Sequence, residues 1–182
     1  MKDRKLEPKD ICGYLPYELQ YGTYNDIETV SDVDFRLKKI AYTDGDLNQI
    51  WSCISHFKPL LIPMSAITQP MTVEGYNDGA EFIPLEVIGK LYNANGKMYE
   101  NSEGVLEFGW SVCNGDDYSG YGLAWSEEDK AFFVYEDEFE YAMFIDNFMT
   151  IEVVNLLHQW HFDINDLIGQ GLALNKLDYN KN

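Results

Sequence analysis

The chain has 182 residues and carries 31 acidic and 13 basic side chains, so its net charge at pH 7 is −18. Such a charge repels nucleic acid and anionic membranes and attracts cations and basic protein surfaces. Hydrophobic residues make up 46% and aromatic residues 15% of the sequence, which is enough for a packed core and unlike a disordered acidic chain. No apolar run reaches the roughly 18 residues of a transmembrane helix.

The negative charge is concentrated along the chain. Between Lys97 and Lys176, sixteen carboxylates are opposed by one basic residue, Lys130, whereas the first nine residues contain four basic side chains. Three scattered cysteines, Cys12, Cys53 and Cys113, show no paired spacing, which is typical of reduced thiols. Because no apolar segment follows the charged N-terminus, we expect a cytoplasmic protein.

In the N-terminal half we expect a short helix followed by strands. Pro8 suits a first helical turn, and the helix must end before Pro16 because the residue preceding a proline avoids helical backbone. The other elements follow from alternating polarity and from prolines that cannot donate to a sheet. The expected elements are a helix at 7–15, strands at 18–24 and 34–43, a strand or helical turn at 47–56, and an extended edge segment at 59–63 followed by a helical turn.

In the C-terminal half the pattern predicts a helix, a hairpin and a helical end. The expected elements are a helix at 85–92, strands at 105–113, 121–125 and 131–135, and two helices that begin at Ile151 and Asp163. Together these predict one α+β domain over residues 1–182, with a mostly antiparallel sheet, a short N-terminal helix and C-terminal helices. The acidic, glycine- and aromatic-rich segment 93–146 fits an insertion or a divergent segment.

Several short motifs occur in a characteristic order. They are Lys9-Asp10-Ile11, Gly13-Tyr14-Leu15-Pro16-Tyr17, Lys58-Pro59-Leu60-Leu61, Pro63-Met64-Ser65, Phe82-Ile83-Pro84, Trp160-His161-Phe162-Asp163, Leu167-Ile168 and Gly171-Leu172-Ala173. In this set the chain resembles a group of short uncharacterised proteins encoded by phages and mobile elements of gut anaerobic bacteria. No activity, cofactor or functional residue is known for that group. The resemblance therefore implies a setting, in which small accessory proteins act by binding host machinery.

Two histidines near the C-terminus are weak candidates for a metal site. His158 and His161 are three residues apart, which on a helix places both on one face, and Asp163 offers a carboxylate just beyond. The spacing of a metalloprotease helix, with its internal glutamate, is missing. We favour a structural interpretation, in which these residues pack into the core and the imidazole nitrogens bond to backbone carbonyls. We accordingly predict no catalytic residue and no cofactor.

Cys53 and His56 are also three residues apart, as a thiol nucleophile and its base can be. A catalytic pair needs a third orienting group that converges on it in space, and the spacing alone does not supply one. We favour an inert, buried thiol at this position.

The acidic segment carries the one pattern with a recognition mechanism. If the strand at 131–135 continues, Glu136, Glu138 and Glu140 all face one side at intervals of roughly 6.6 to 6.8 Å. Such a row can imitate a phosphate backbone, and Phe139 and Tyr141 between the carboxylates supply aromatic anchors. The alternative is a surface that only keeps the protein soluble.

The sequence thus favours a non-enzymatic, protein-binding or regulatory accessory protein of phage or mobile-element origin. Its expected partner is a host protein, and in the sharper hypothesis the acidic surface is a DNA mimic against a basic nucleic-acid-binding protein. No direct contact with nucleic acid or membrane is expected. Two alternatives stay open: a metal-assisted hydrolase that uses His158, His161 and nearby carboxylates, and a self-assembling structural component. The sequence does not predict the oligomeric state.

Overall fold

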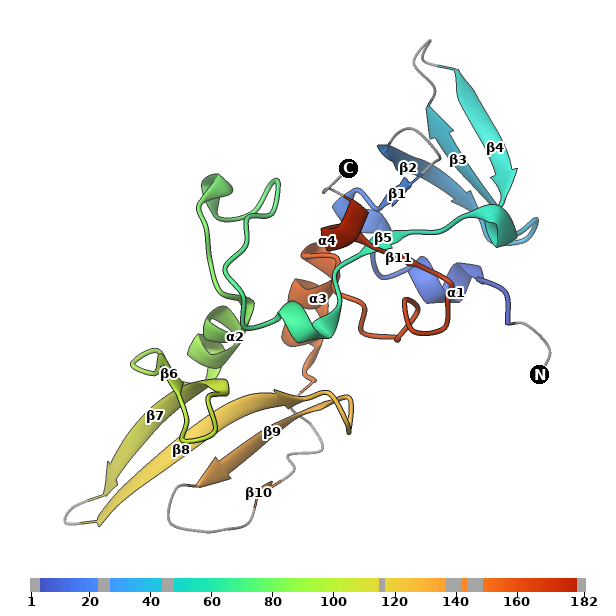
Figure 1. The fold of residues 1–182 in the computed structure, drawn as a ribbon. Coiled ribbons are helices and arrows are strands. Elements are labelled where there is room, and N and C mark those ends of the chain that lie inside the picture. The colour runs from blue at the N-terminus through green and yellow to red at the C-terminus, as the bar shows by residue number, and fades with distance from the viewer. Residues whose placement is uncertain are drawn as a thin grey trace. The chain divides into compact units, whose positions relative to one another are not determined.

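The computed structural model describes residues 4–22, 27–43, 48–114, 117–136, 142–143 and 149–179 (Figure 1). Mostly antiparallel strands and short helices confirm the predicted α+β class. The contacts group the chain into two compact units. Unit 1 comprises Met1–Met64 and Val154–Asn182, and unit 2 comprises Ser65–Val153. The predicted insertion, 93–146, lies entirely within unit 2.

Unit 1 is built on a small antiparallel sheet. Its elements are α1 (Pro8–Ile11), β1 (Gln20–Gly22), β2 (Ile27–Asp34), β3 (Lys39–Thr43), β4 (Gln49–Cys53), β5 (Leu60–Leu61), β11 (Leu174–Asn175) and α4 (Lys176–Tyr179), with short 3-10 helices at Leu15–Tyr17 and Ile54–His56. Strands β1 to β4 pair in sequence order, and β11 pairs in parallel with β5 (Figure 1). The N-terminal and C-terminal parts of the chain are therefore joined through this unit.

Local sequence explains how unit 1 begins. Glu7 and Asp10 form a capping box around α1, and Pro8 occupies the first turn, as predicted. The predicted strand at 34–43 is correct only for its second half. Asp34 ends β2, its carboxylate accepts the N–H of Leu37 at 2.7 Å, and Lys38 takes a positive φ of 52°, so residues 35–38 form a turn.

The core of unit 1 joins residues from both ends of the chain. Its buried side chains are Leu6, Ile11, Tyr14, Leu19, Tyr21, Ile40, Ile54, Phe57, Leu61, Leu167 and Ala173. Tyr14 is fully buried, and its hydroxyl donates to the carbonyl of Phe162 at 2.8 Å. A buried hydroxyl needs such a partner, so this bond fixes the register between the two chain ends.

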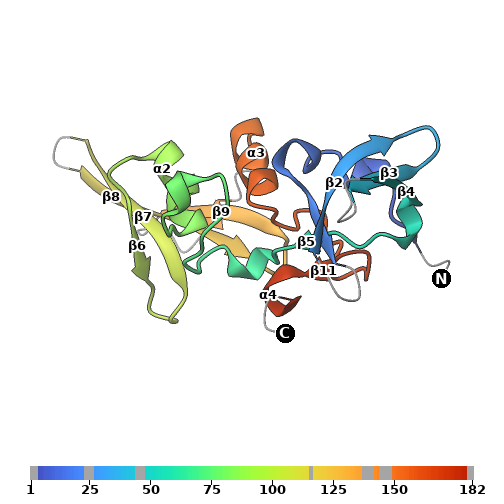
Figure 2. The same cartoon turned by 90° about the horizontal axis from the view of Figure 1, so that it is seen from above.

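Among its described residues, unit 2 contains the helix α2 (Pro84–Tyr92), a 3-10 helix at Asn77–Gly79 and one larger antiparallel sheet. The strands of the sheet are β6 (Lys97–Glu100), β7 (Leu106–Asn114), β8 (Asp117–Ser126), β9 (Ala131–Glu136) and β10 (Ala142–Met143), paired in the order β10-β9-β8-β7-β6. The predicted helix at 85–92 and hairpin at 121–135 are confirmed. Figure 2 shows β6 to β9 beside α2 from a second direction. Helix α3 (Ile151–Gln159) begins in unit 2 and ends in unit 1.

The second predicted C-terminal helix, beginning at Asp163, is absent from the described residues, which instead show successive turns from 164 to 173. Asp166 has φ 54° and Gly171 has φ 70°, both in the left-handed region that interrupts a right-handed helix. The apolar residues at helical spacing, Leu167 and Ile168, pack with the unit 1 core from this turn segment. Tertiary packing has thus overridden the local periodicity.

Candidate functional site

His161, the first of the predicted metal candidates, forms a backbone contact. It is buried, and its Nε2 lies 2.6 Å from the carbonyl oxygen of Tyr17. A carbonyl only accepts, so Nε2 carries the proton. Burial, assisted by Lys176, lowers the pKa of His161 to about 4, and the ring is neutral at pH 7. The predicted structural interpretation, an imidazole bonded to a backbone carbonyl, is confirmed at this residue.

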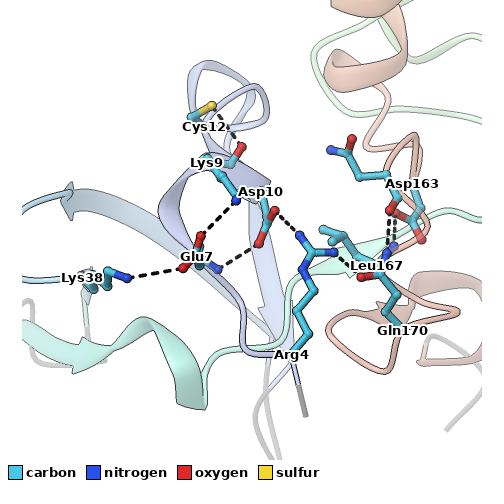
Figure 3. A network of polar contacts seen from close by, with 10 residues as sticks. Arg4, Glu7, Lys9, Asp10, Cys12, Lys38, Asp163, Leu167 and Gln170 are labelled. Carbon is cyan, nitrogen blue, oxygen red and sulfur yellow. Dashed lines mark hydrogen bonds and ion pairs between the residues drawn. The ribbon is translucent and has the colours of Figure 1, made fainter. Parts of the chain in front are cut away.

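Asp163 likewise directs its carboxylate at backbone groups. Its Oδ1 accepts the N–H of Leu167 at 2.8 Å and its Oδ2 accepts the N–H of Ile168 at 2.7 Å (Figure 3). Asp163 is only 6% exposed, and this burial raises the pKa of Asp163 against the opposing effect of the N–H bonds. Both oxygens of this carboxylate hold the turn segment in place.

His158 completes the predicted trio and packs against the N-terminal segment. Its ring lies edge-on to Tyr14, with ring centroids 4.5 Å apart. A Cβ atom on Gly13 would lie 2.2 Å from the ring, so only glycine permits this approach. Among the described residues, no three His, Cys, Asp or Glu side chains are placed to hold a metal ion together.

A polar network fastens the beginning of the described chain to the turn segment. Arg4 pairs with the buried carboxylate of Asp10 at 2.5 Å and also donates to Gln170 (Figure 3). Asp10 in turn accepts the N–H of Glu7 at 2.9 Å. Together with the contacts of Tyr14, His158 and His161, these bonds hold residues 13–17 against residues 158–163. Several motifs of the resemblance therefore make structural contacts within unit 1, whereas Phe82-Ile83-Pro84 lies in unit 2.

Cys53 and His56 do not form the nucleophile pair that their spacing allows. The thiol of Cys53 is exposed on β4, so the predicted buried position is wrong. Its Sγ lies 3.1 Å from the hydroxyl of Ser55, and this contact is the main cause that lowers the pKa of Cys53. His56 follows in the 3-10 helix Ile54–His56. The thiol therefore has a hydroxyl, not an imidazole, as its hydrogen-bond partner.

The separation of charge along the sequence coincides with the division into two units. Unit 2 contains 18 acidic and 3 basic residues, whereas unit 1 contains 13 acidic and 10 basic residues. Two of the three basic residues in unit 2 are neutralised locally, because Lys90 pairs with Glu86 at 2.5 Å and Lys130 pairs with Glu127 at 3.0 Å. Unit 2 is therefore a concentrated source of negative potential.

The predicted recognition residues begin at the end of β9. Glu136 pairs with Tyr121 in the register between β9 and β8, and the Tyr121 hydroxyl donates to its carboxylate at 3.2 Å. Trp110 on β7 stacks on Tyr121, with centroids 5.7 Å apart and an interplanar angle of 17°. These three half-buried side chains form an acidic, aromatic cluster on one face of the sheet. The other predicted partner-binding residues, Glu138, Phe139, Glu140 and Tyr141, lie outside the described residues.

The opposite face holds a buried carboxylate that the sequence analysis did not single out. Glu107 is 3% exposed and accepts hydrogen bonds from Tyr99 at 2.8 Å, from Asn101 at 2.6 Å and from Tyr135. Burial, followed by the bond to Glu107, raises the pKa of Tyr135. This carboxylate ties β6, β7 and β9 together. Because it is buried, it stabilises the sheet and does not take part in recognition.

Cross-strand glycines create the room for these tyrosines. Gly109 and Gly122 face each other on β7 and β8. A Cβ on Gly109 would lie 2.4 Å from the Tyr99 ring, and a Cβ on Gly122 would lie 2.3 Å from the Tyr135 ring. Gly109 on β7 and the alternating Gly120 and Gly122 on β8 were the available signal, since a glycine inside a strand marks a close approach.

No family model, curated protein or solved structure matches the chain. Within the described ranges, the helices all lack the length and apolarity that crossing a membrane requires.

Proposed function

We propose that this protein is a non-enzymatic accessory protein that binds another protein through the acidic, aromatic surface of unit 2. The observation that carries the proposal is the segregation of charge, with 18 acidic and 3 basic residues in unit 2. Unit 2 also exposes apolar side chains that an interface can bury, among them Val105, which is 45% exposed, and Leu106, which is 41% exposed.

The charge selects a basic partner. Unpaired carboxylates at the surface speed association with a basic protein and suppress binding of acidic ones, and both effects weaken with added salt. In the sharper form of the proposal, the surface is a DNA mimic, and the partner is a host protein that normally binds nucleic acid. The resemblance to phage and mobile-element proteins supports a host protein as target. Exposed thiols at Cys12 and Cys53 support a reducing, cytoplasmic setting.

The side chains proposed for the hydrolase alternative make structural contacts instead of lining a site. His161 and Asp163 are engaged by the backbone bonds described above, and His158 packs on Tyr14. The sheet of unit 2 has a groove of about 240 Å³, and neither a histidine nor a carboxylate lines it. The lining residues are Lys97, Tyr99, Gly109, Trp110, Ser111, Gly120 and Tyr121. A concave site with converging acid and base groups would be needed for hydrolysis.

Affinity capture from a host lysate across a salt series tests the proposal. The tagged full-length chain is expected to retain a basic protein at low salt and to release most of it at roughly 0.3 M salt, because the Debye length falls below about 8 Å there. Retention of an acidic or neutral partner at high salt contradicts the electrostatic mechanism. Recovery of the untagged chain alone would instead identify self-assembly.

A further inference from the structure

Unit 1 contains a pocket that the proposed function does not use. Its volume is about 350 Å³, which lies at the small end of the range for ligand sites. The lining residues are Tyr21, Gly22, Ile40, Tyr42, Ser52, His56 and Phe57. They come from β1, β3, β4 and the segment that follows β4, so paired strands form most of the wall.

Three aromatic rings of this pocket are inclined to one another. The Tyr21 and Tyr42 centroids are 5.4 Å apart with their planes at 62°, and the Tyr21 and Phe57 centroids are 4.8 Å apart with their planes at 49°. The rings are in direct contact with one another at these distances, and all three residues also line the pocket. Tyr21 and Phe57 are buried in the unit 1 core, which holds their ring positions.

The electrostatics of the pocket favour a cation. None of the lining residues is a lysine, an arginine or a carboxylate. A carboxylate lies directly behind one wall, because the hydroxyl of Tyr21 donates to Glu28. Aromatic faces carry negative potential that attracts ammonium groups, and a nearby carboxylate adds to it. The same negative potential would repel an anionic ligand.

From the inclined rings of Tyr21, Tyr42 and Phe57 around one pocket, we propose that unit 1 binds an alkylammonium group. The group belongs to a small quaternary amine or to a methylated lysine side chain, since the two share the same charged methyl-rich head. The hydroxyl of Ser52 and the exposed ring of His56 at the pocket contact the remainder of the ligand. The proposal is independent of the recognition surface, because every lining residue lies in unit 1.

Choline and its uncharged isostere, 3,3-dimethylbutan-1-ol, test the proposal by calorimetry or ligand-observed NMR on the full-length chain. Choline is expected to bind with a dissociation constant on the order of 1 mM, and the isostere roughly tenfold more weakly, which corresponds to about 1.4 kcal/mol. Equal affinities would overturn the proposal, because an apolar hollow does not distinguish the two. Failure of choline to bind at about 50 mM would overturn it as well.

Two variants locate the binding, and a third ligand identifies its source. Tyr42→Leu removes a half-buried ring while keeping an apolar side chain, and it is expected to weaken choline roughly tenfold. As a control, Trp51→Leu removes an exposed ring of β4 that does not line the pocket, and the affinity for choline is expected to stay within about twofold of the wild type. Equal effects of both variants, with folding confirmed by circular dichroism, would overturn the assignment. Free Nε-trimethyllysine bound more tightly than choline would indicate a protein side chain as the natural ligand.

Discussion

Replacing Phe108 with alanine is expected to lower the free energy of unfolding of unit 2 by about 3–5 kcal/mol, the usual cost of removing a buried aromatic ring. Phe108 is fully buried on β7 and pairs with the buried Leu123 on β8. Its ring fills the space between two glycines, because a Cβ on Gly89 would lie 2.1 Å from it and a Cβ on Gly96 would lie 2.3 Å from it. The ring therefore joins α2, the turn after it and the sheet.

Urea denaturation of the full-length variant, followed by circular dichroism, measures this loss. Gly89→Ala approaches the same contact from the other side and is expected to cost about 1–3 kcal/mol, because it overfills the site. A matched change on the exposed end of the same helix, Leu91→Ala, is expected to change stability by about 0.5 kcal/mol or less. If Phe108→Ala were no more damaging than Leu91→Ala, the packing of α2 on β7 would be wrong.

Acidification from pH 7 to pH 4 is expected to destabilise unit 1 through His161. The pKa of His161 falls from 6.5 to about 4 in the folded protein, chiefly because the ring is buried. The unfolded chain therefore takes up a proton before the folded chain does. Stability from this residue is complete above pH 6.5 and is lost as the pH falls toward about 4, by about 3 kcal/mol in total.

Neighbouring groups modify this dependence in known directions. Burial lowers the pKa of His158 as well, so His158 adds to the loss on acidification. Burial raises the pKa of Asp163, so the folded state gains a proton there first and is stabilised by acid. The contribution of His161 is isolated by comparing urea midpoints of the wild type and of His161→Asn between pH 7 and pH 4.

Asparagine suits this position because residue 161 has a φ of 62°, a left-handed conformation that asparagine tolerates. The variant is expected to show a smaller loss of stability on acidification than the wild type. Parallel pH profiles of the two proteins would contradict the buried, neutral imidazole.

Elements with a local cause could be predicted from the sequence. Pro84 favours the start of α2, and polar residues favour the turn between β8 and β9. Both features were predicted correctly. Strand β2 was missed because its exposed and half-buried residues alternate weakly and it ends inside the segment assigned to the next strand. The turn segment after Asp163 was assigned to a helix, because the periodicity of Leu167 and Ile168 reflects packing in the unit 1 core.

The candidate site, too, could be predicted only where a feature follows from the local sequence or composition. Charge is a property of composition, so the acidic half could be predicted. The contact of Glu136 with Tyr121, and the stacking of Trp110 on Tyr121, depend on strand register and were not predicted. Burial of an individual carboxylate is not a property of composition. Glu107 resembles every other acid in its segment, and its withdrawal depends on strand register, which places Tyr99 and Tyr135 over two glycines. Likewise, the aromatic pocket joins residues that are distant in sequence.

The affinity of the captured basic partner for a variant that lacks three of the acidic charges tests the recognition surface most directly. Glu136→Gln, Glu138→Gln and Glu140→Gln remove three charges together. The melting temperature is expected to change little, because glutamine keeps the oxygen that accepts the Tyr121 hydrogen bond. A control variant removes three charges from unit 1 instead, through Glu18→Gln, Asp32→Asn and Asp166→Asn. The account predicts that the first variant binds roughly tenfold more weakly at low salt, and that the control binds nearly as the wild type does. Equal losses in both variants, or none in the first, would contradict an acidic recognition surface on unit 2.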